Sequence, residues 1–408
     1  MTALLMVACG QTSKRMQDGV SADSAEVMPL EYAKGFTVRI LENGVKLVDV
    51  ADPQEDEDRM PVSYRFALVP KSGLKSADGI PADGIPDGYT RVEVPVERTL
   101  VMTMLQLSNF TALDALDVVK GITGTKNLFN KDILRRVEDG RIVKIGMEGN
   151  FDTELILASH PEVIFISPFK RGGYDAIKET GITLVPHLGY KEAHPLGQAE
   201  WVKFVALFIG KEKEADALFG GIKDRYLALA EKVNTLLSTS DSQPSPPNSH
   251  PSTPDSQPST LNSKPSRPTV FSGEMHGGNW FAVGGRNHLA QMFRDAGAEY
   301  ILKDDNTGGV PIEYEQMYAT AANADYWRIL NSFPGDFSYE ALRASEPRNE
   351  LFKAFKERHV IYCNMKRTPY YESSPVQPDV LLADLVAIFH PEVMDEDYTP
   401  TYYRLLKK

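Results

Sequence analysis

The chain has 408 residues, and its composition excludes several classes of protein. Apolar residues make up 42% of it, charged residues 25% and aromatic residues 9%, which excludes wholesale disorder, collagen and a coiled coil. The net charge of −12, without a long Lys/Arg run, excludes a nucleic-acid binder that follows the phosphate backbone. The length exceeds what one hydrophobic core usually organises, so we expect two lobes or domains.

Two distant cysteines exclude a disulfide framework and a Cys-based zinc site. Cys9 follows a short apolar run, residues 2–8, as in a lipoprotein signal that is cleaved before a lipid-bearing cysteine. The run has no basic region before it, so we expect the true start to lie upstream. Residues 1–30 are predicted to be a signal remnant and tether, with Cys9 lipidated; a buried or accidental cysteine is the alternative. Cys363 is expected to be a packed thiol.

Residues 31–91 are predicted to be a β-rich N-terminal extension. Apolar and polar residues alternate on both sides of Glu42-Asn43-Gly44, which indicates a hairpin, and residues 64–69 are a third strand. From Val92 the pattern changes to helices that lead into continuous apolar strands, such as residues 163–166. This alternation predicts an α/β fold with mostly parallel sheets covered on both faces.

The chain from Val92 onward divides into a lobe, a long helix and a second lobe. Residues 92–193 form the predicted N-terminal lobe, and residues 194–237 form helices in which the apolar positions step by three or four. Residues 238–268 are mostly Ser and Pro, with a 14-residue repeat, and are predicted to be a disordered insertion. Residues 269–408 form the predicted C-terminal lobe.

The sequence resembles a known family, the class III or helical-backbone periplasmic substrate-binding proteins of ABC importers. The resemblance covers roughly residues 92–395 without the insertion. It is carried by the order and spacing of several motifs: Asp152 to Ile164, His194-Pro195-Leu196-Gly197 to Trp201, Gly284-Gly285-Arg286-Asn287 to Ala298, and Gln377-Pro378-Asp379 to Pro391. The resemblance implies two Rossmann-like α/β lobes joined by a single long α-helix, with residues 31–91 as an extra β-rich segment.

The resemblance also implies capture of a ligand, without catalysis or a cofactor. Members of the family bind an iron-siderophore, haem or cobalamin in a cleft between the lobes and deliver it to an ABC permease. The sequence does not choose among these ligands. Loops that follow the strands supply candidate aromatic, cationic and other polar contacts. These candidates are Glu148, Phe169, Arg171, His276, Trp280, Arg286, Arg367, Tyr370 and Tyr371.

Docking to the permease is implied as well, through one carboxylate on each lobe. Glu315 is the candidate on the C-terminal lobe and Asp175 the weaker candidate on the N-terminal lobe; an acid that only stabilises a helix start is the alternative for both. We therefore expect a monomer, anchored by lipid on the periplasmic side of the bacterial cell envelope.

Two rival functions remain at this stage. The first is an ABC importer protein that binds bare Zn²⁺ or Mn²⁺ through histidines, although no histidine pair has the spacing that a metal site favours. The second is an enzyme, but the sequence has no nucleophile elbow, His-Glu-x-x-His motif or phosphate loop.

Overall fold

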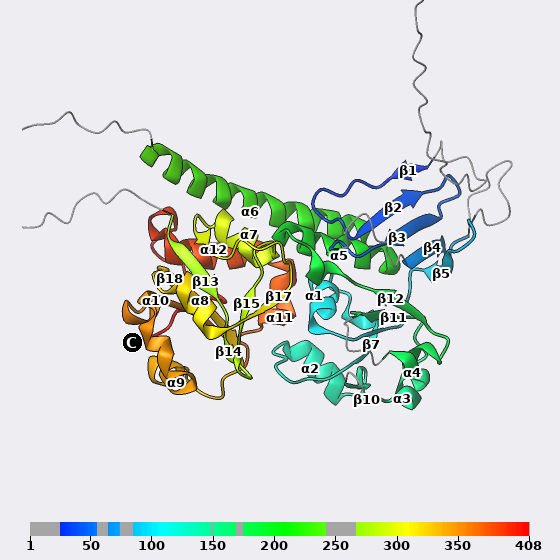
Figure 1. Ribbon diagram of the computed structural model, residues 1–408. Helices are drawn as coiled ribbons and strands as arrows, with labels where there is room; N and C mark the ends of the chain where they lie inside the picture. Colours follow the sequence, from blue (N-terminus) through cyan, green and yellow to red (C-terminus); the bar gives the residue numbers. More distant parts are fainter. Residues whose placement is uncertain are drawn as a thin grey trace, which may run out of the picture.

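Two α/β lobes lie side by side beneath one long helix, α6 (Glu212–Asp241), as Figure 1 shows. The computed structural model describes residues 25–54, 64–73, 85–147, 150–168, 174–241 and 267–407. The α/β architecture with parallel sheets is the predicted one. Residues 1–24, with Cys9, and residues 242–266 of the expected insertion lie outside the described ranges.

The N-terminal lobe is built on a parallel sheet in the order β12-β11-β6-β7-β8. Its strands are β6 (Thr99–Val101), β7 (Val119–Ile122), β8 (Val143–Lys144), β11 (Val163–Ile166) and β12 (Thr183–Pro186). The other elements are α1 (Met104–Ala112), α2 (Lys131–Glu138), α3 (Thr153–Ala158), α4 (Asp175–Lys178) and the short pair β9 (Gly146–Met147) and β10 (Asn150–Phe151). Every residue of β11 is buried, as expected for an apolar strand with neighbours on both sides.

The C-terminal lobe repeats this plan with the sheet order β16-β13-β18-β19-β20, in which only β20 is antiparallel. Its strands are β13 (Thr269–Ser272), β16 (Glu299–Tyr300), β18 (Tyr326–Asn331), β19 (Val360–Asn364) and β20 (Arg404–Leu405). A small antiparallel sheet adds β14 (Glu274–His276), β15 (Asn279–Val283) and β17 (Gly309–Ile312). The helices are α7 (His288–Asp295), α8 (Tyr314–Ala321), α9 (Tyr339–Ser345), α10 (Lys353–Lys356), α11 (Tyr370–Ser373) and α12 (Pro378–Phe389).

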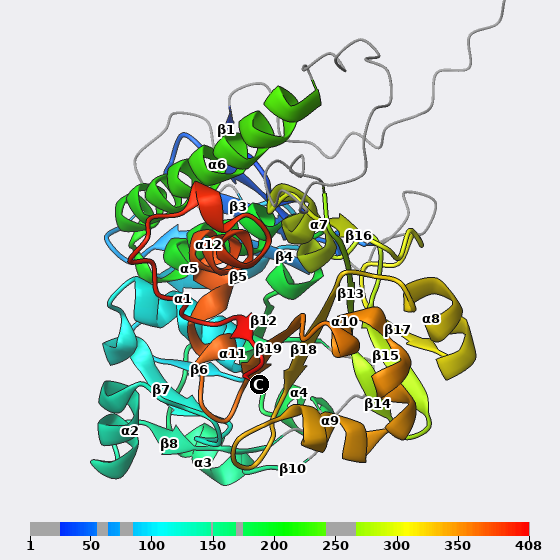
Figure 2. The same ribbon diagram turned by 90° about the vertical axis from the view of Figure 1, so that its left-hand side faces the viewer.

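Helices cover both faces of the C-terminal sheet, with α7 and α12 on one side and α8, α9 and α10 on the other (Figure 2). Cys363 is on β19, within this sheet. The residue is buried, and burial raises the pKa of its thiol to about 11. The thiol is therefore a packed side chain, as expected from the sequence.

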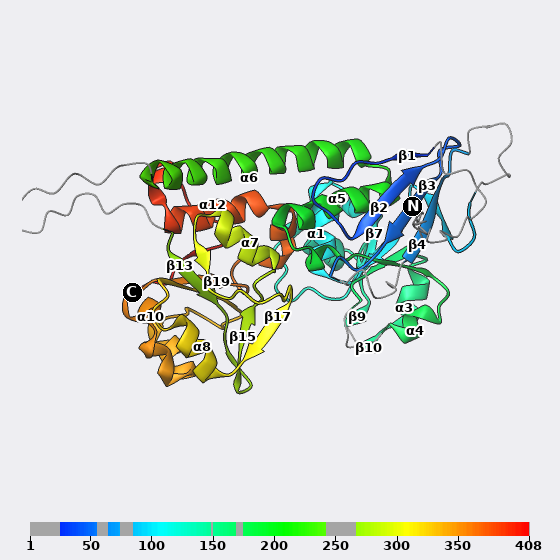
Figure 3. The same cartoon turned by 45° about the horizontal axis from the view of Figure 1, so that its top comes forward.

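Helix α6 is held in place by an apolar stripe and by polar contacts, two of which join it to the C-terminal lobe. Its apolar residues repeat at helical spacing and are buried. The Tyr226 hydroxyl donates to Asp295 of α7 at 2.6 Å, and Arg225 pairs with Asp379 of α12 at 2.7 Å. Figure 3 shows α6 extending across both lobes, with α5 (Pro195–Ile209) beneath one end. Between α5 and α6, Gly210 adopts a φ of 71°, which favours glycine.

The N-terminal segment forms a five-stranded sheet of its own in the order β1-β2-β3-β4-β5. Its strands are β1 (Glu26–Val27), β2 (Phe36–Ile40), β3 (Lys46–Val50), β4 (Tyr64–Pro70) and β5 (Thr90–Val94). The predicted hairpin is present as the antiparallel pair of β2 and β3. Because β5 pairs with β4, this sheet includes residues 92–94, which the sequence analysis placed in the N-terminal lobe.

Two buried carboxylates of the N-terminal lobe hold this sheet in place. Glu200 of α5 accepts hydrogen bonds from the backbone N–H groups of residues 31, 32 and 33 at distances of 2.7 to 3.1 Å. Glu192 accepts from the N–H groups of residues 34 and 35, each at 2.9 Å, and from the Trp201 indole. The Phe36 ring packs on Trp201 with centroids 4.9 Å apart. We call this contact the sheet junction.

Across the described ranges, no helix is long and apolar enough to cross a membrane.

Candidate ligand site between the lobes

The carboxyl ends of the parallel strands define one edge of each lobe. In the N-terminal lobe, β7 leads into the loop of residues 123–130, and β6 leads into α1, which begins with a capping box made by Thr103 and Gln106. In the C-terminal lobe, β19 leads into residues 365–369 and then α11. Open α/β sheets bind ligands at this edge, so these loops are where a ligand is expected.

The two edges meet at the Glu372 side chain. Its carboxylate is 6% exposed and accepts hydrogen bonds from the backbone N–H groups of Phe129, at 2.6 Å, and Asn130, at 2.7 Å. Helix α11 also packs against α1, and Figure 1 shows these two helices between the lobes. We call this contact the lobe junction. The loops that follow β7 and β19 are thus neighbours, although they are about 240 residues apart in the chain.

A buried cation lies beside the lobe junction. Arg328 of β18 is 6% exposed, and its guanidinium donates to the hydroxyls of Tyr403, at 3.0 Å, and Tyr370, at 3.4 Å. The Tyr403 hydroxyl donates in turn to that of Tyr370 at 2.9 Å. The described residues form no ion pair with this guanidinium within 4 Å, and phenol oxygens are its hydrogen-bond partners instead.

Tyr371, one of the predicted ligand contacts, is accessible beside this network. The residue is 44% exposed, and its ring packs edge-on against Tyr370 with centroids 5.2 Å apart. Its neighbour Tyr370 is 8% exposed and serves the buried network with Arg328. Tyr370 is thus a packed residue in this structure, and it could touch a ligand only with its remaining edge.

Trp280 is a core residue, which contradicts its prediction as a ligand contact. It has no exposed surface, packs between Phe271 and Trp327, and donates its indole N–H to the Ser272 carbonyl at 2.9 Å. The cause is strand alternation, because β15 turns Trp280 and Ala282 toward the core and Phe281 outward. Phe281, 46% exposed, is therefore the accessible aromatic of this strand.

The remaining predicted contacts in the described ranges are all exposed. His276 is at the end of β14, on the same face of the small sheet as Phe281. Arg367 follows β19 and forms an ion pair with Asp336, whereas Arg286 forms one with Asp305 at 3.2 Å. Three further candidates, Glu148, Phe169 and Arg171, lie outside the described residues.

The two predicted docking acids are on the surface of separate lobes. Glu315 is in the first turn of α8 and pairs with Arg348 at 2.8 Å, while Arg348 also stacks on the Tyr314 ring. Asp175 is the first residue of α4 and lies 3.4 Å from Lys178 in the same helix. Both helices are on the side of the molecule away from α6 (Figure 1).

Sequence reasoning missed Arg328, Tyr403 and Glu372. One signal was available: a lone arginine between the apolar residues of the strand 326–330 is unusual, because a buried charge is costly without partners. Tyr403 and Glu372 gave no such signal, since their partners lie far away in the chain.

Histidines in the described ranges do not converge as metal ligands. No group of three His, Cys, Asp or Glu side chains there is placed to hold a metal ion. His187 packs on Trp201 with ring centroids 4.7 Å apart, and burial lowers its pKa to about 3. His288 begins α7, and burial lowers its pKa to about 4. These two histidines serve packing between elements.

The chain has relatives among known proteins, although no family model matches it. An uncharacterised lipoprotein of Methanocaldococcus jannaschii is 27% identical over 385 residues, covering 89% of this chain and 82% of that protein. A second uncharacterised lipoprotein of that organism is 25% identical over 338 residues, covering 80% of this chain and 78% of that protein.

Solved structures give the same architecture at low sequence identity. A periplasmic haem-binding protein from Pseudomonas aeruginosa has 17% identity and a TM-score of 0.54, covering 75% of this chain and 96% of its own. A TroA-like periplasmic binding protein from Veillonella parvula has 16% identity and a TM-score of 0.50, covering 77% and 95%. A Helicobacter pylori protein in complex with nickel and histidine has 14% identity and a TM-score of 0.52, covering 74% and 85%.

The chain has the two-lobe fold of the TroA-like periplasmic binding proteins. Fold alone does not fix function, so the ligand must be argued from the residues at the carboxyl edges.

Proposed function

We propose that this protein is the substrate-binding protein of an ABC importer and holds its ligand between the two lobes. The observation that carries the proposal is the lobe junction, where loops from the carboxyl edges of both sheets meet through Glu372. Tyr371 precedes Glu372 in α11 and is 44% exposed, so it is accessible beside this junction. The fold of the periplasmic binding proteins supports the same role, which is capture and not catalysis.

We propose an iron chelate, either haem or a ferric siderophore, as the ligand. Exposed aromatic residues, Tyr371 and Phe281, supply flat apolar contact, and Arg367 supplies a cation for carboxylate or other oxygen groups at the rim. Among the proteins with this fold, the one from P. aeruginosa is described as haem-binding, which supports the chelate. Cobalamin has no such support among the three solved structures described above, and it is one of the probes in the titration below.

We place the protein at the cell envelope, on the outer side of the membrane, with a lipid on Cys9. The support is the short apolar run before Cys9 and the name lipoprotein carried by the two M. jannaschii relatives. A lipid anchor and a tether ending near residue 25 would keep the ligand site close to a permease.

A thermal-shift titration of the purified protein tests the ligand. The probes are haem, a ferric siderophore, cobalamin, Zn²⁺ and Mn²⁺, because a ligand that binds only the folded state raises Tm with concentration. We expect haem or the siderophore to raise Tm. Stabilisation by Zn²⁺ or Mn²⁺ alone would favour the metal alternative, and a flat response to every probe would contradict the proposal.

A matched pair of variants locates the site. Tyr371→Ala should weaken chelate binding about tenfold, which corresponds to about 1.4 kcal/mol and fits the loss of one accessible aromatic contact. Leu351→Ala is the control, because Leu351 is 42% exposed on the same lobe but lies in another region. Equal effects of the two changes would show that Tyr371 is not at the site.

We further propose that Glu315 and Asp175 dock the loaded protein onto basic side chains of the permease. The Glu315 carboxylate would exchange Arg348 for a permease arginine. Glu315→Lys should reduce ligand uptake in cells and leave the affinity of the purified protein unchanged; a loss of affinity would contradict the docking role.

A further inference from the structure

A pocket of about 400 Å³ lies at the opposite edge of the N-terminal lobe from the lobe junction. Its wall includes Arg98, Val119 and Val143, which stand at the amino-terminal ends of β6, β7 and β8. The proposed ligand site is at the carboxyl ends of the same sheet. The pocket is therefore a separate feature, and its size is within the usual range of small-molecule sites, about 300 to 1,000 Å³.

The pocket gathers four cations in a chain with a net charge of −12. They are Arg98, Lys120, Arg136 and Arg141, and Asp117 is the one acid in the wall. Among the described residues, neither the Arg98 guanidinium nor the Lys120 ammonium forms an ion pair within 4 Å, and both donate to backbone carbonyls. Cations thus outnumber acids four to one in the wall, and two of the four are not held in an ion pair by the described residues.

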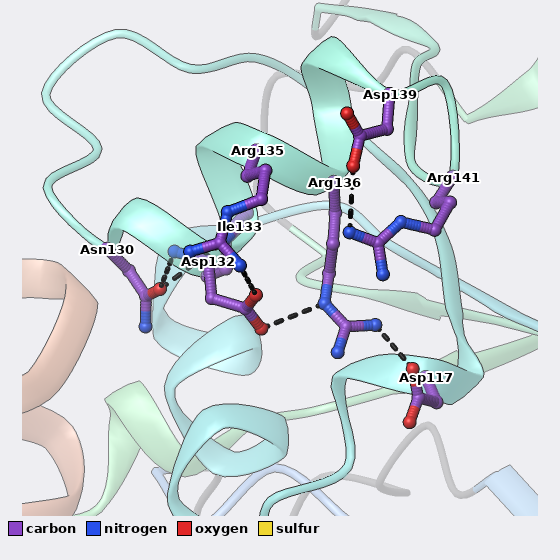
Figure 4. A network of polar contacts seen from close by, with 8 residues as sticks. All are labelled: Asp117, Asn130, Asp132, Ile133, Arg135, Arg136, Asp139 and Arg141. Carbon is purple, nitrogen blue, oxygen red and sulfur yellow. Dashed lines mark hydrogen bonds and ion pairs between the residues drawn. The ribbon is translucent and has the colours of Figure 1, made fainter.

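The arginines are held in position by neighbouring groups, as Figure 4 shows for two of them. Arg136 donates through Nε to Asp132 at 2.9 Å and through Nη1 to Asp117, and Arg141 donates to Asp139 at 2.9 Å. Arg98 is fixed by the carbonyls of residues 159 and 160. A guanidinium has five N–H groups, so each arginine keeps donors for a further acceptor while its position is already ordered.

Four apolar side chains, those of Val119, Val143, Leu155 and Ala158, line another part of the wall, which Gly140 and Ser159 complete. Arginine forks match the oxygens of phosphate, and an apolar wall beside them suits an organic portion larger than a bare ion. We propose that this pocket binds the phosphate group of a small organic phosphate, either a soluble ester or the headgroup of an anionic phospholipid.

Calorimetric titration of the full chain with glycerol phosphate tests the pocket, with inorganic phosphate as the smaller probe. The variant Lys120→Gln with Arg141→Gln removes two charges from the wall. The matched control, Lys131→Gln with Arg135→Gln, removes two exposed charges from α2 outside the wall. We expect saturable binding that the first variant weakens at least tenfold and the control changes less than twofold, with affinity falling as salt rises.

Two results would overturn the proposal: no saturable binding of glycerol phosphate up to about 10 mM, or an equal loss in both double variants. Vesicles of phosphatidylglycerol, compared with phosphatidylcholine, identify the source. If the wall variant loses binding to the anionic vesicles and the control variant does not, the ligand of the pocket is a lipid headgroup. If vesicle binding is unchanged in both variants, the ligand is a soluble ester. Both outcomes are independent of the ligand held between the lobes.

Discussion

The sheet junction and the lobe junction both join distant parts of the chain through buried carboxylates, but they differ in extent. At the sheet junction, Glu200 and Glu192 accept five backbone N–H groups and an indole, and aromatic rings pack around them. At the lobe junction, α11 packs against α1, and Glu372 accepts two backbone N–H groups. The N-terminal sheet should therefore behave as a fixed part of its lobe, and the contact between the lobes should yield first.

This difference fits the proposed function. A binding protein must admit a ligand between its lobes, and the region that opens comes from the less stable part of a structure. The N-terminal sheet has no such requirement.

Removal of the Glu200 carboxylate should have the largest effect. Glu200→Ala leaves three backbone donors without an acceptor and leaves Lys203, 3.1 Å away, without its buried partner. We expect the free energy of unfolding to fall by about 3 to 5 kcal/mol, as for other broken buried pairs, measured by denaturant unfolding. The control Asp216→Asn removes the exposed partner of Lys203 and should cost less than about 1 kcal/mol.

Acid should weaken the structure through its buried histidines. Burial lowers the pKa of His187 to about 3 and that of His288 to about 4. In the unfolded chain both histidines have a pKa near 6.5, so they take up protons there at pH values where they stay neutral in the folded chain. The contribution of these two neutral histidines to the free energy of unfolding is present above pH 6.5 and is lost as pH falls toward 4. The unfolding free energy of native protein should drop by about 2 kcal/mol more than that of His187→Gln between pH 6.5 and 4.5. Parallel curves for the two proteins would contradict this assignment.

Loss of the Glu372 charge should have the smallest effect. Glu372→Gln keeps an oxygen acceptor for one of the N–H groups of Phe129 and Asn130 and leaves the other without an acceptor, so we expect a stability loss of about 1 kcal/mol by denaturant unfolding. The variant should also change the rate of ligand binding, because the contact between the lobes is weaker. Glu357→Gln, an exposed acid on the same lobe, is the control. A loss as large as that of Glu200→Ala would erase the distinction between the junctions.

Much of the fold was predictable because periodicity is a local property of the sequence. The apolar run 163–166 is β11, the residues around Gly44 form a hairpin, and the steps of three and four after Lys211 form α6.

The site was less predictable because it depends on contacts between distant residues. An alternating strand does not reveal which face will be covered, so Trp280 and Phe281 could not be told apart from the sequence. Glu192, Glu200 and Glu372 look like ordinary surface acids, since their backbone partners are 157 to 243 residues away. Only Arg328, inside an apolar strand, carried a local signal.

Hydrogen exchange of the native protein, with and without the chelate that stabilises it most, tests the central claim directly. In the free protein, the amides of residues 31–35 should exchange more slowly than those of Phe129 and Asn130, because the sheet junction is the more extensive. The chelate should slow exchange in residues 123–130 and 365–376 and leave residues 31–35 unchanged. Protection centred on residues 31–35, or on the pocket around Arg98 and Arg141, would contradict a ligand site between the lobes.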